Sequence, residues 1–199
     1  MVKRDTRHPV VEVGDQLGEL DRLADRLVPR RNRAEVLERF EEMFRSGAPP
    51  DPPPSGPLDG RLLATSTWGP WDSVVQQLAP GWMPWLGKSF DPEAQTGVNH
   101  FLPTAGTRLL MKVMFPRYVP ERERLDRIEA FPFRTRIAPG ELDPSVDVLK
   151  IDYDFEPNPV LVRRILDELV QVAPGRYLGK VLMRVRDAHH RVGFFSLSL

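Results

Sequence analysis

The sequence predicts a mainly β fold with helices, in which an antiparallel β-barrel follows a pair of N-terminal helices. Two observations carry this prediction. Apolar residues recur at three- and four-residue spacing before residue 47, whereas alternation dominates after residue 57. Six or seven predicted strands are joined mostly by short turns, without the β–α–β alternation that a parallel sheet needs. A long, curved antiparallel sheet tends to close on itself, because closure removes its unpaired edges.

Two short amphipathic helices are predicted at the N-terminus. The first has an apolar stripe over residues 17–27 and ends at Pro29; the second follows Asn32, a candidate N-cap, and has an apolar face over residues 36–44. Neither helix can bury its apolar face alone. We therefore expect the helices to pack on each other and on the rest of the chain, or on a second subunit in a homodimer.

A proline-rich segment, APPDPPPSGP at residues 48–57, is the clearest boundary in the chain. Proline lacks a backbone donor and is excluded from helix interiors and central strands, so this segment is predicted to be a stiff connector. The predicted organisation is a helical segment at 1–47, the connector at 48–57 and a barrel domain at 58–199.

The barrel domain contains the following predicted elements. Strands are expected at 58–67, 96–102, 107–115, 124–138, 145–155, 176–186 and 190–199, the last two as a hairpin. A short helix is expected at 69–80, and a second helix at 159–172, after Asn158-Pro159, with an apolar stripe at Val162, Ile165, Leu166, Leu169 and Val170. The stretch LGKSF at 86–90 is interpreted as a turn; it is similar to the end of a phosphate-binding loop but lacks the upstream glycines.

Composition excludes several classes of protein. Lys plus Arg and Asp plus Glu each number 28, which is unlike the basic surface of a nucleic-acid-binding protein. No apolar stretch is long enough to span a membrane or to form the core of a secretory signal, so we expect a cytoplasmic protein. The absence of cysteine excludes disulfides and thiolate chemistry.

The C-terminal strands resemble those of a known group of barrels. The stretch YLGKVLMRVRDAHHRVGFFSL is similar to the closing strands of calycin-type (lipocalin-like) barrels, and in particular of the plastid lipid-associated, or fibrillin, proteins. The matching residues are Tyr177, Leu178, Leu182, Arg184, Val185, Arg186, Gly193, Phe195 and Leu197. The resemblance extends over residues 58–199, although GRLLA stands where lipocalins carry G-x-W. It implies a calycin-like barrel and an apolar ligand.

All four tryptophans lie in one 18-residue window, at positions 68, 71, 82 and 85. Two interpretations stay open. The rings fill one end of the barrel as packed core, or they form a rigid wall for an apolar ligand. The predicted ligand-binding residues are Trp68, Trp71, Trp82, Trp85, Phe101, Tyr153 and Met183.

Five polar residues are candidates for catalysis: His100, Asn99, Lys150, Asp152 and Arg184. Asn99 and His100 are consecutive on a strand, so one of them faces the barrel interior. Lys150 and Asp152 share a strand face, which we expect to lie outside the barrel or near its mouth; the same ambiguity applies to Arg184. No metal site is predicted, because His189 and His190 lie in one turn whereas metal ligands converge from several elements.

Three functions fit these observations, and the sequence does not decide whether the protein is an enzyme. The first is a barrel that binds a hydrophobic small molecule such as a lipid, isoprenoid or polyketide. The second is a cofactor-independent cyclase or isomerase acting on an apolar substrate, which needs positioning and a placed donor more than a nucleophile. The third is an interaction protein, in which the N-terminal helices and the proline-rich segment recruit a partner and the barrel, with a filled interior, is a scaffold. An apolar cavity of roughly several hundred Å³ would support the first two, and convergent polar groups inside it the second.

Overall fold

The computed structural model describes residue 22 and residues 33–65 and 84–199. In these residues eight antiparallel strands close into a barrel, because β3 pairs with β2 on one side and with β5 on the other. The strands are β1 (Gly56–Thr65), β2 (Trp85–Asp91), β3 (Thr96–Phe101), β5 (Ile128–Pro139), β6 (Asp147–Asp152), β7 (Ile165–Ala173), β8 (Arg176–Val185) and β9 (Ala188–Ser198). The short strand β4 (Arg122–Glu123) pairs with β5. The predicted mainly β fold with an antiparallel barrel is confirmed.

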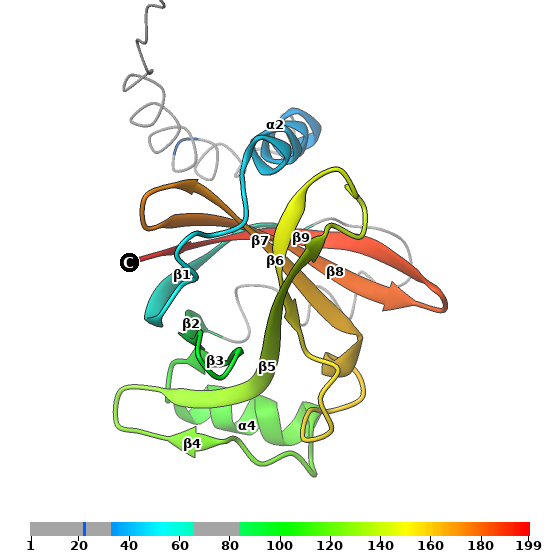
Figure 1. Ribbon diagram of the computed structural model, residues 1–199. Helices are drawn as coiled ribbons and strands as arrows, with labels where there is room; N and C mark the ends of the chain where they lie inside the picture. Colours follow the sequence, from blue (N-terminus) through cyan, green and yellow to red (C-terminus); the bar gives the residue numbers. More distant parts are fainter. Residues whose placement is uncertain (1–21, 23–32, 66–83) are drawn as a thin grey trace, which may run out of the picture.

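Two α-helices, α2 and α4, lie at opposite ends of the barrel (Figure 1). Helix α2 (Arg33–Ser46) is near one end, and α4 (Ala105–Met114) is at the other. Strands β8 and β9 form the predicted hairpin, and β9 also pairs with β1. The N-terminal strand is thus tied to the C-terminal one, and the sheet has no free edge there.

The barrel interior holds the larger of two apolar clusters. Strand β6 and the residue that follows it show how the wall divides: Leu149, Ile151 and Tyr153 belong to the interior cluster, whereas Val148 belongs to a second cluster on the outer face. The alternation that the sequence showed over 145–155 therefore separates the inside of the barrel from the outside.

Helix α2 covers part of the outer face of the barrel. Its residues Val36, Phe40, Met43 and Phe44 pack in the outer cluster with side chains from β1, β6, β7, β8 and β9. The Phe40 and Phe194 rings lie 5.5 Å apart. Packing on the same chain is one of the two alternatives that the sequence left open; the other, a homodimer seam, stays a prediction.

A buried lysine on β8 also anchors α2. Lys180 is fully buried, and its ammonium lies 2.8 Å from Glu41 of α2 and 2.6 Å from Asp143 in the β5–β6 connection. The same ammonium is 4.1 Å from the centre of the Phe44 ring. A charge taken out of water needs such partners, so these contacts fix both the helix and the connection against the barrel.

The strand predicted at 107–115 is wrong, because this stretch forms most of α4. The helix begins after Thr104, whose side-chain oxygen accepts a hydrogen bond from the Thr107 backbone N–H at 3.1 Å. Its inward face is formed by Thr107 and Met111, one turn apart, and Leu110 and Met114 pack on the barrel core. This spacing is helical, and with the cap it outweighs the β-like composition.

The helix predicted at 159–172 is also wrong. A single 3-10 turn, η3 (Val162–Arg164), leads into strand β7. The strand is covered on both faces: Leu169 packs in the interior, and Val170 packs in the outer cluster under α2. A strand buried on both faces loses the simple alternation of apolar and polar residues, and here the remaining pattern imitated a helix.

Some predictions fall outside the described residues: the first helix of the N-terminal pair, the helix at 69–80, and the placement of Trp68, Trp71 and Trp82. The division at residues 47 and 57 stays a prediction. Across the part of the chain that the structure describes, no helix has the length and apolarity that crossing a bilayer requires.

Replacing Phe40 by alanine tests the packing of α2. Because this ring is fully buried between α2 and the barrel, we expect Phe40→Ala to lower the free energy of unfolding by about 3–5 kcal/mol. Leu109→Ala is the matched control, since Leu109 also lies on a helix but is 64% exposed; it should change stability by less than about 1 kcal/mol. Urea denaturation measures both, and equal losses would contradict the packing described.

Candidate ligand site

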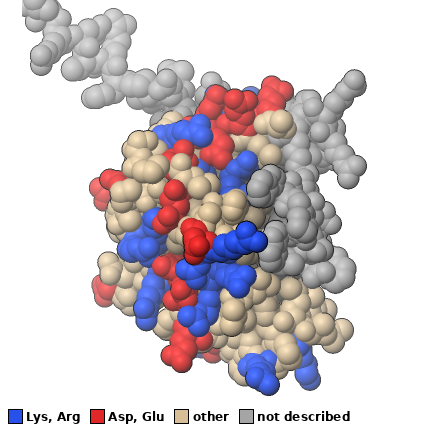
Figure 2. Space-filling model, turned by 90° about the vertical axis from the view of Figure 1, so that its right-hand side faces the viewer, with Lys and Arg blue, Asp and Glu red and all other residues tan. Residues whose placement is uncertain are grey.

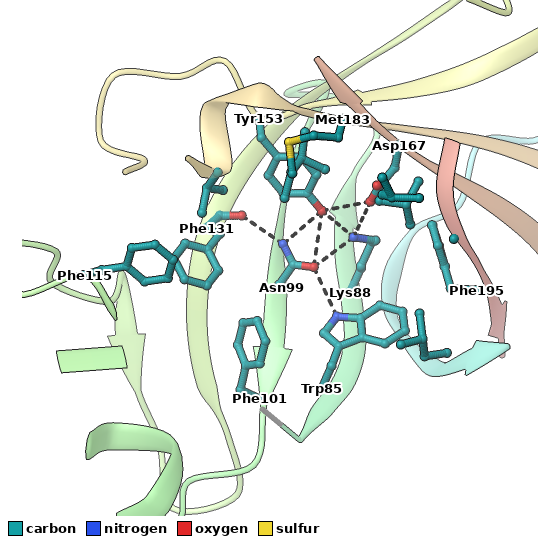
Figure 3. Close-up of a pocket in the computed structure, with 16 residues that line it drawn as sticks. Trp85, Lys88, Asn99, Phe101, Phe115, Phe131, Tyr153, Asp167, Met183 and Phe195 are labelled. Carbon is teal, nitrogen blue, oxygen red and sulfur yellow. Dashed lines mark hydrogen bonds and ion pairs between the residues drawn. The ribbon is translucent and has the colours of Figure 1, made fainter. Parts of the chain in front are cut away.

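A cavity of about 180 Å³ lies inside the barrel (Figure 3). Its wall is mainly apolar and is formed by residues of β1, β2, β3, β5, β7, β8 and β9, of η3, and of the stretches that follow α4 and β6. The lining residues are Leu62, Trp85, Lys88, Asn99, Phe101, Phe115, Phe131, Tyr153, Val162, Ile165, Asp167, Val181, Met183, Val192, Gly193 and Phe195. Four polar residues, Lys88, Asn99, Tyr153 and Asp167, meet at one part of this wall (Figure 3).

An irregularity in β2 puts Trp85 and Lys88 on the same side of the wall. Residues three apart face opposite sides of a regular strand, but the pairing of β2 with β3 shifts between Trp85 and Gly87. Gly87 has a φ of 141°, and a Cβ there would lie 2.0 Å from the Leu58 carbonyl oxygen. Only glycine fits this position. The turn predicted at 86–90 is therefore wrong: this stretch is a strand bent by its glycine.

Strands β3 and β5 supply the next part of the site. Asn99 and Phe101 lie two apart on β3 and both line the cavity. On β5, Phe131 has a φ of 56°, where the register between β3 and β5 shifts. Its carbonyl oxygen accepts a hydrogen bond from Asn99 Nδ2 at 3.1 Å. The Asn99 amide is thereby held with its oxygen, Oδ1, toward Trp85 and Lys88 (Figure 3).

Lys88 is the centre of the polar group. Its ammonium, on a side chain only 3% exposed, donates to Asn99 Oδ1 at 2.8 Å and to the Tyr153 hydroxyl, and lies 3.0 Å from Asp167 Oδ2. Each partner comes from a different part of the barrel: Asn99 from β3, Tyr153 from just beyond β6, and Asp167 from β7. The ion pair with Asp167 neutralises the ammonium inside the barrel.

Aromatic rings surround the same ammonium. The ring centroids of Trp85, Phe133, Tyr153 and Phe195 lie 5.1–5.4 Å from Lys88 Nζ. A cation at this distance is attracted to the electron-rich face of such a ring. Burial still lowers the pKa of Lys88 below its ordinary value of 10.5, while the Asp167 carboxylate acts in the opposite direction.

Tyr153 is held in its protonated form. Burial raises its pKa well above the ordinary value of 10.0, and the negative charge of Asp167 raises it further. The Tyr153 hydroxyl lies 3.2 Å from Asp167 Oδ2. The group thus combines a neutral phenol, a carboxylate and an ammonium in a largely apolar cavity, which is an arrangement able to bind or to transfer a proton.

The structure brings together five of the residues that the sequence singled out. Of the proposed catalytic residues, Asn99 lines the cavity; of the proposed ligand-binding residues, Trp85, Phe101, Tyr153 and Met183 do.

The four other candidate catalytic residues do not line the cavity. Lys150 is buried but pairs with Glu141 at 2.6 Å, and Asp152 pairs with Arg136 at 2.9 Å. Arg184 pairs with Asp154 at 3.5 Å. Figure 2 shows charges of both signs interleaved on one face of the molecule. Each of these three side chains is therefore part of an ion pair outside the cavity.

His100 lies on the opposite side of β3 from Asn99. Its Nε2 is 3.0 Å from Ser89 Oγ, and burial lowers its pKa below the ordinary 6.5, with the Arg127 charge acting in the same direction. Within the described residues, no cluster of three or more His, Cys, Asp or Glu side chains is placed to hold a metal ion.

Sequence reasoning missed two central residues, Lys88 and Asp167. Lys88 lies in the stretch predicted to be a turn, and Asp167 in the stretch predicted to be a helix. The sequence did contain a signal that Lys88 lies on a strand. Apolar and polar residues alternate loosely in WLGKSF, and a glycine inside such a pattern marks a bulge. For Asp167 the only local signal was a charged pair, Asp167 and Glu168, inside an apolar run, and this pair fits a solvent-exposed helix face equally well.

Comparison with known proteins adds support for the fold. No family model and no curated protein matches the chain. A crystal structure of a protein from Thermomonospora curvata is similar, with a TM-score of 0.50 and 16% identity over 94% of this chain and 98% of that one. At this identity the likeness shows the fold alone. The closed antiparallel barrel is consistent with a calycin-like architecture, whereas a relationship to the fibrillin proteins is not shown.

A double-mutant cycle tests the buried ion pair. Lys88→Met leaves the Asp167 carboxylate buried without its cation, so we expect a loss of about 3–5 kcal/mol in the free energy of unfolding. Adding Asp167→Asn removes the stranded charge and should recover part of this loss. Arg136→Met, at an exposed pair, is the control and should cost no more than about 1 kcal/mol. Equal losses from Lys88→Met and Arg136→Met would contradict the role given to the pair.

Alkaline titration tests the burial of the tyrosines. The chain has three, and burial raises the pKa of each; that of Tyr118, whose ring stacks on Phe131, is raised to about 12. Between pH 10 and 12 the folded protein therefore keeps protons that the unfolded chain has lost, and stability falls as pH rises through this range. Ultraviolet absorbance should show little tyrosinate in the native protein at pH 10.5 and much more in denaturant. Equal ionisation in both states would contradict the structure.

Proposed function

We propose that the barrel binds a small, mostly apolar molecule in its interior, with one polar group of that molecule directed at the Lys88–Asp167 group. The observation that carries this proposal is the cavity itself: apolar side chains form most of its wall, and a few polar groups converge at one place. Sites for small molecules commonly combine an apolar surface with a few placed polar groups that fix the orientation of the ligand.

The size of the cavity limits the ligand. The cavity of about 180 Å³ is smaller than the several hundred Å³ expected from the sequence for a barrel that encloses an apolar ligand. An engineered apolar cavity of about 150 Å³ in another protein holds benzene, so the volume here suits one substituted ring or a short branched chain. An isoprenoid, lipid or polyketide-like ligand would be small, or would place only one end in the cavity. The resemblance to plastid lipid-associated proteins points to the same apolar class.

A cyclase or isomerase of an apolar substrate is the second candidate. The specific observation in its favour is that Lys88, Tyr153 and Asp167, three ionisable side chains, share one buried network on the cavity wall. The Asp167 carboxylate of such a network can accept a proton from a bound molecule and return it, without a cofactor. Incubating a molecule extracted from the protein with wild type and with Tyr153→Phe separates the candidates, because turnover by wild type that the variant lacks requires an enzyme.

Filling the cavity tests the binding proposal. Val181 lines the cavity, so Val181→Phe should occupy the ligand space. We expect wild-type protein to be stabilised by p-xylene in a thermal melt, and the variant to show no such stabilisation. Ile137→Phe is the control, since Ile137 is 54% exposed and lies on β5 away from the cavity; it should respond as wild type does.

Mass spectrometry of an extract of the purified protein completes the test. A small apolar molecule that accompanies wild type and Ile137→Phe, but not Val181→Phe, supports binding in the cavity. Wild-type protein that carries no such molecule, and that neither p-xylene nor p-cresol stabilises, would contradict the proposal.

A further inference from the structure

The donors and acceptors of the polar group can be counted one by one. An ammonium has three hydrogens, and Lys88 has three acceptors: Asn99 Oδ1 at 2.8 Å, the Tyr153 hydroxyl, and Asp167 Oδ2 at 3.0 Å. All three hydrogens are therefore used within the protein. Lys88 has no hydrogen left to offer to a ligand.

The remaining donors are used as well. Asn99 Nδ2 donates to the Phe131 carbonyl and to the Tyr153 hydroxyl, each at 3.1 Å. The indole N–H of Trp85 donates to Asn99 Oδ1 at 3.1 Å. The single hydroxyl hydrogen of Tyr153 has an acceptor in Asp167 Oδ2 at 3.2 Å. The network keeps each of its donors occupied, so it has none for an acceptor group on a ligand.

One acceptor is left over. Asp167 Oδ2 interacts with Lys88 and Tyr153, but the other carboxylate oxygen, Oδ1, is buried and has no hydrogen-bond partner among the described residues. The Asp167 side chain is only 5% exposed and lines the cavity. A buried acceptor without a partner is unfavourable, because it has lost the hydrogen bonds that water would give it.

We infer that the ligand of this cavity is a neutral molecule with a hydroxyl or N–H group that donates to Asp167 Oδ1, attached to a small apolar body. This inference rests on the proposed function. Charge narrows the class further: Lys88 and Asp167 neutralise each other, so a cationic ligand would add an unpaired positive charge beside the Lys88 ammonium. An anionic ligand would be repelled by Asp167 Oδ1, and the network has no free hydrogen-bond donor to offer it. Alcohols and phenols fit both conditions.

A series of matched probes tests the inference on the wild-type protein by calorimetry. In p-xylene a methyl group replaces the hydroxyl of p-cresol at nearly the same size, 4-methylanisole keeps the oxygen without the donor, and 4-methylbenzylamine carries a positive charge. We expect p-cresol to bind at least about tenfold more tightly than each of the others, since a site with an unpaired buried group discriminates against ligands that cannot satisfy it.

The outcomes separate this inference from the proposed function. If p-xylene binds as tightly as p-cresol, the cavity binds apolar molecules but the inferred donor contact is wrong. If 4-methylanisole or the amine binds most tightly, the inferred ligand class is wrong. If none of the four binds, both the inference and the proposed function are contradicted.

An amide at position 167 gives an independent test. In Asp167→Asn the amide oxygen should take the place of Oδ2, because Lys88 and Tyr153 both direct hydrogens there, and the NH₂ group should take the place of Oδ1. The free position then becomes a donor, so the preference for p-cresol over 4-methylanisole should fall by about tenfold.

Asp152→Asn makes the same chemical change outside the cavity and should leave the preference as in wild type. An unchanged preference in Asp167→Asn would overturn the inferred contact. Should Asp167→Asn fail to fold, the probe series on the wild-type protein still decides the inference.

Discussion

The ammonium of Lys88, enclosed in the barrel, is the constraint on which the site depends. A positive charge inside an apolar barrel is tolerated only with partners, and these come from three separate parts of the sheet: Asn99, Tyr153 and Asp167. A shift of one residue in the register of any of these strands would turn its partner to the outer face. The buried charge therefore constrains the pairing of the strands as well as the chemistry of the cavity.

The glycine of β2 makes this arrangement feasible. Without the bend at Gly87, Trp85 and Lys88 would face opposite sides of the wall, and the ammonium would lose either its contact with the Trp85 ring or its place in the interior. A buried ion pair is seldom more stabilising than apolar residues of similar volume. We therefore interpret the Lys88–Asp167 pair as a feature of function, in agreement with the buried Asp167 oxygen, Oδ1, that has no hydrogen-bond partner among the described residues.

Where charged residues alternate with apolar ones along a strand, the sequence predicted the strand well. Examples are β6, where Lys150 and Asp152 flank Ile151, and β8, where Lys180 precedes Val181. The prediction failed for β7, where the adjacent Asp167 and Glu168 interrupt the alternation and the spacing of the apolar residues imitates a helix. It failed for α4 because the capping residue Thr104 was overlooked, although that signal was present in the sequence.

The site was predictable only in part, for a related reason. Its aromatic wall is visible in composition, so Trp85, Phe101 and Tyr153 could be chosen from their types and positions. The pairing of Lys88 with Asp167 depends on contacts between residues 79 positions apart, and nothing local to either residue specifies the other. Lys150 and Arg184 are as conspicuous as Lys88 in the sequence, and only the closed sheet shows which lysine points inward.

The most direct test of this account is a crystal structure of the purified protein at a resolution that shows ordered water and small ligands. The account predicts that Lys88 Nζ lies within hydrogen-bond distance of Asn99, Tyr153 and Asp167, and that a donor atom of a bound molecule or of a water lies next to Asp167 Oδ1 in the cavity. A Lys88 side chain directed through the wall to solvent, with the cavity filled by the protein's own side chains, would contradict it.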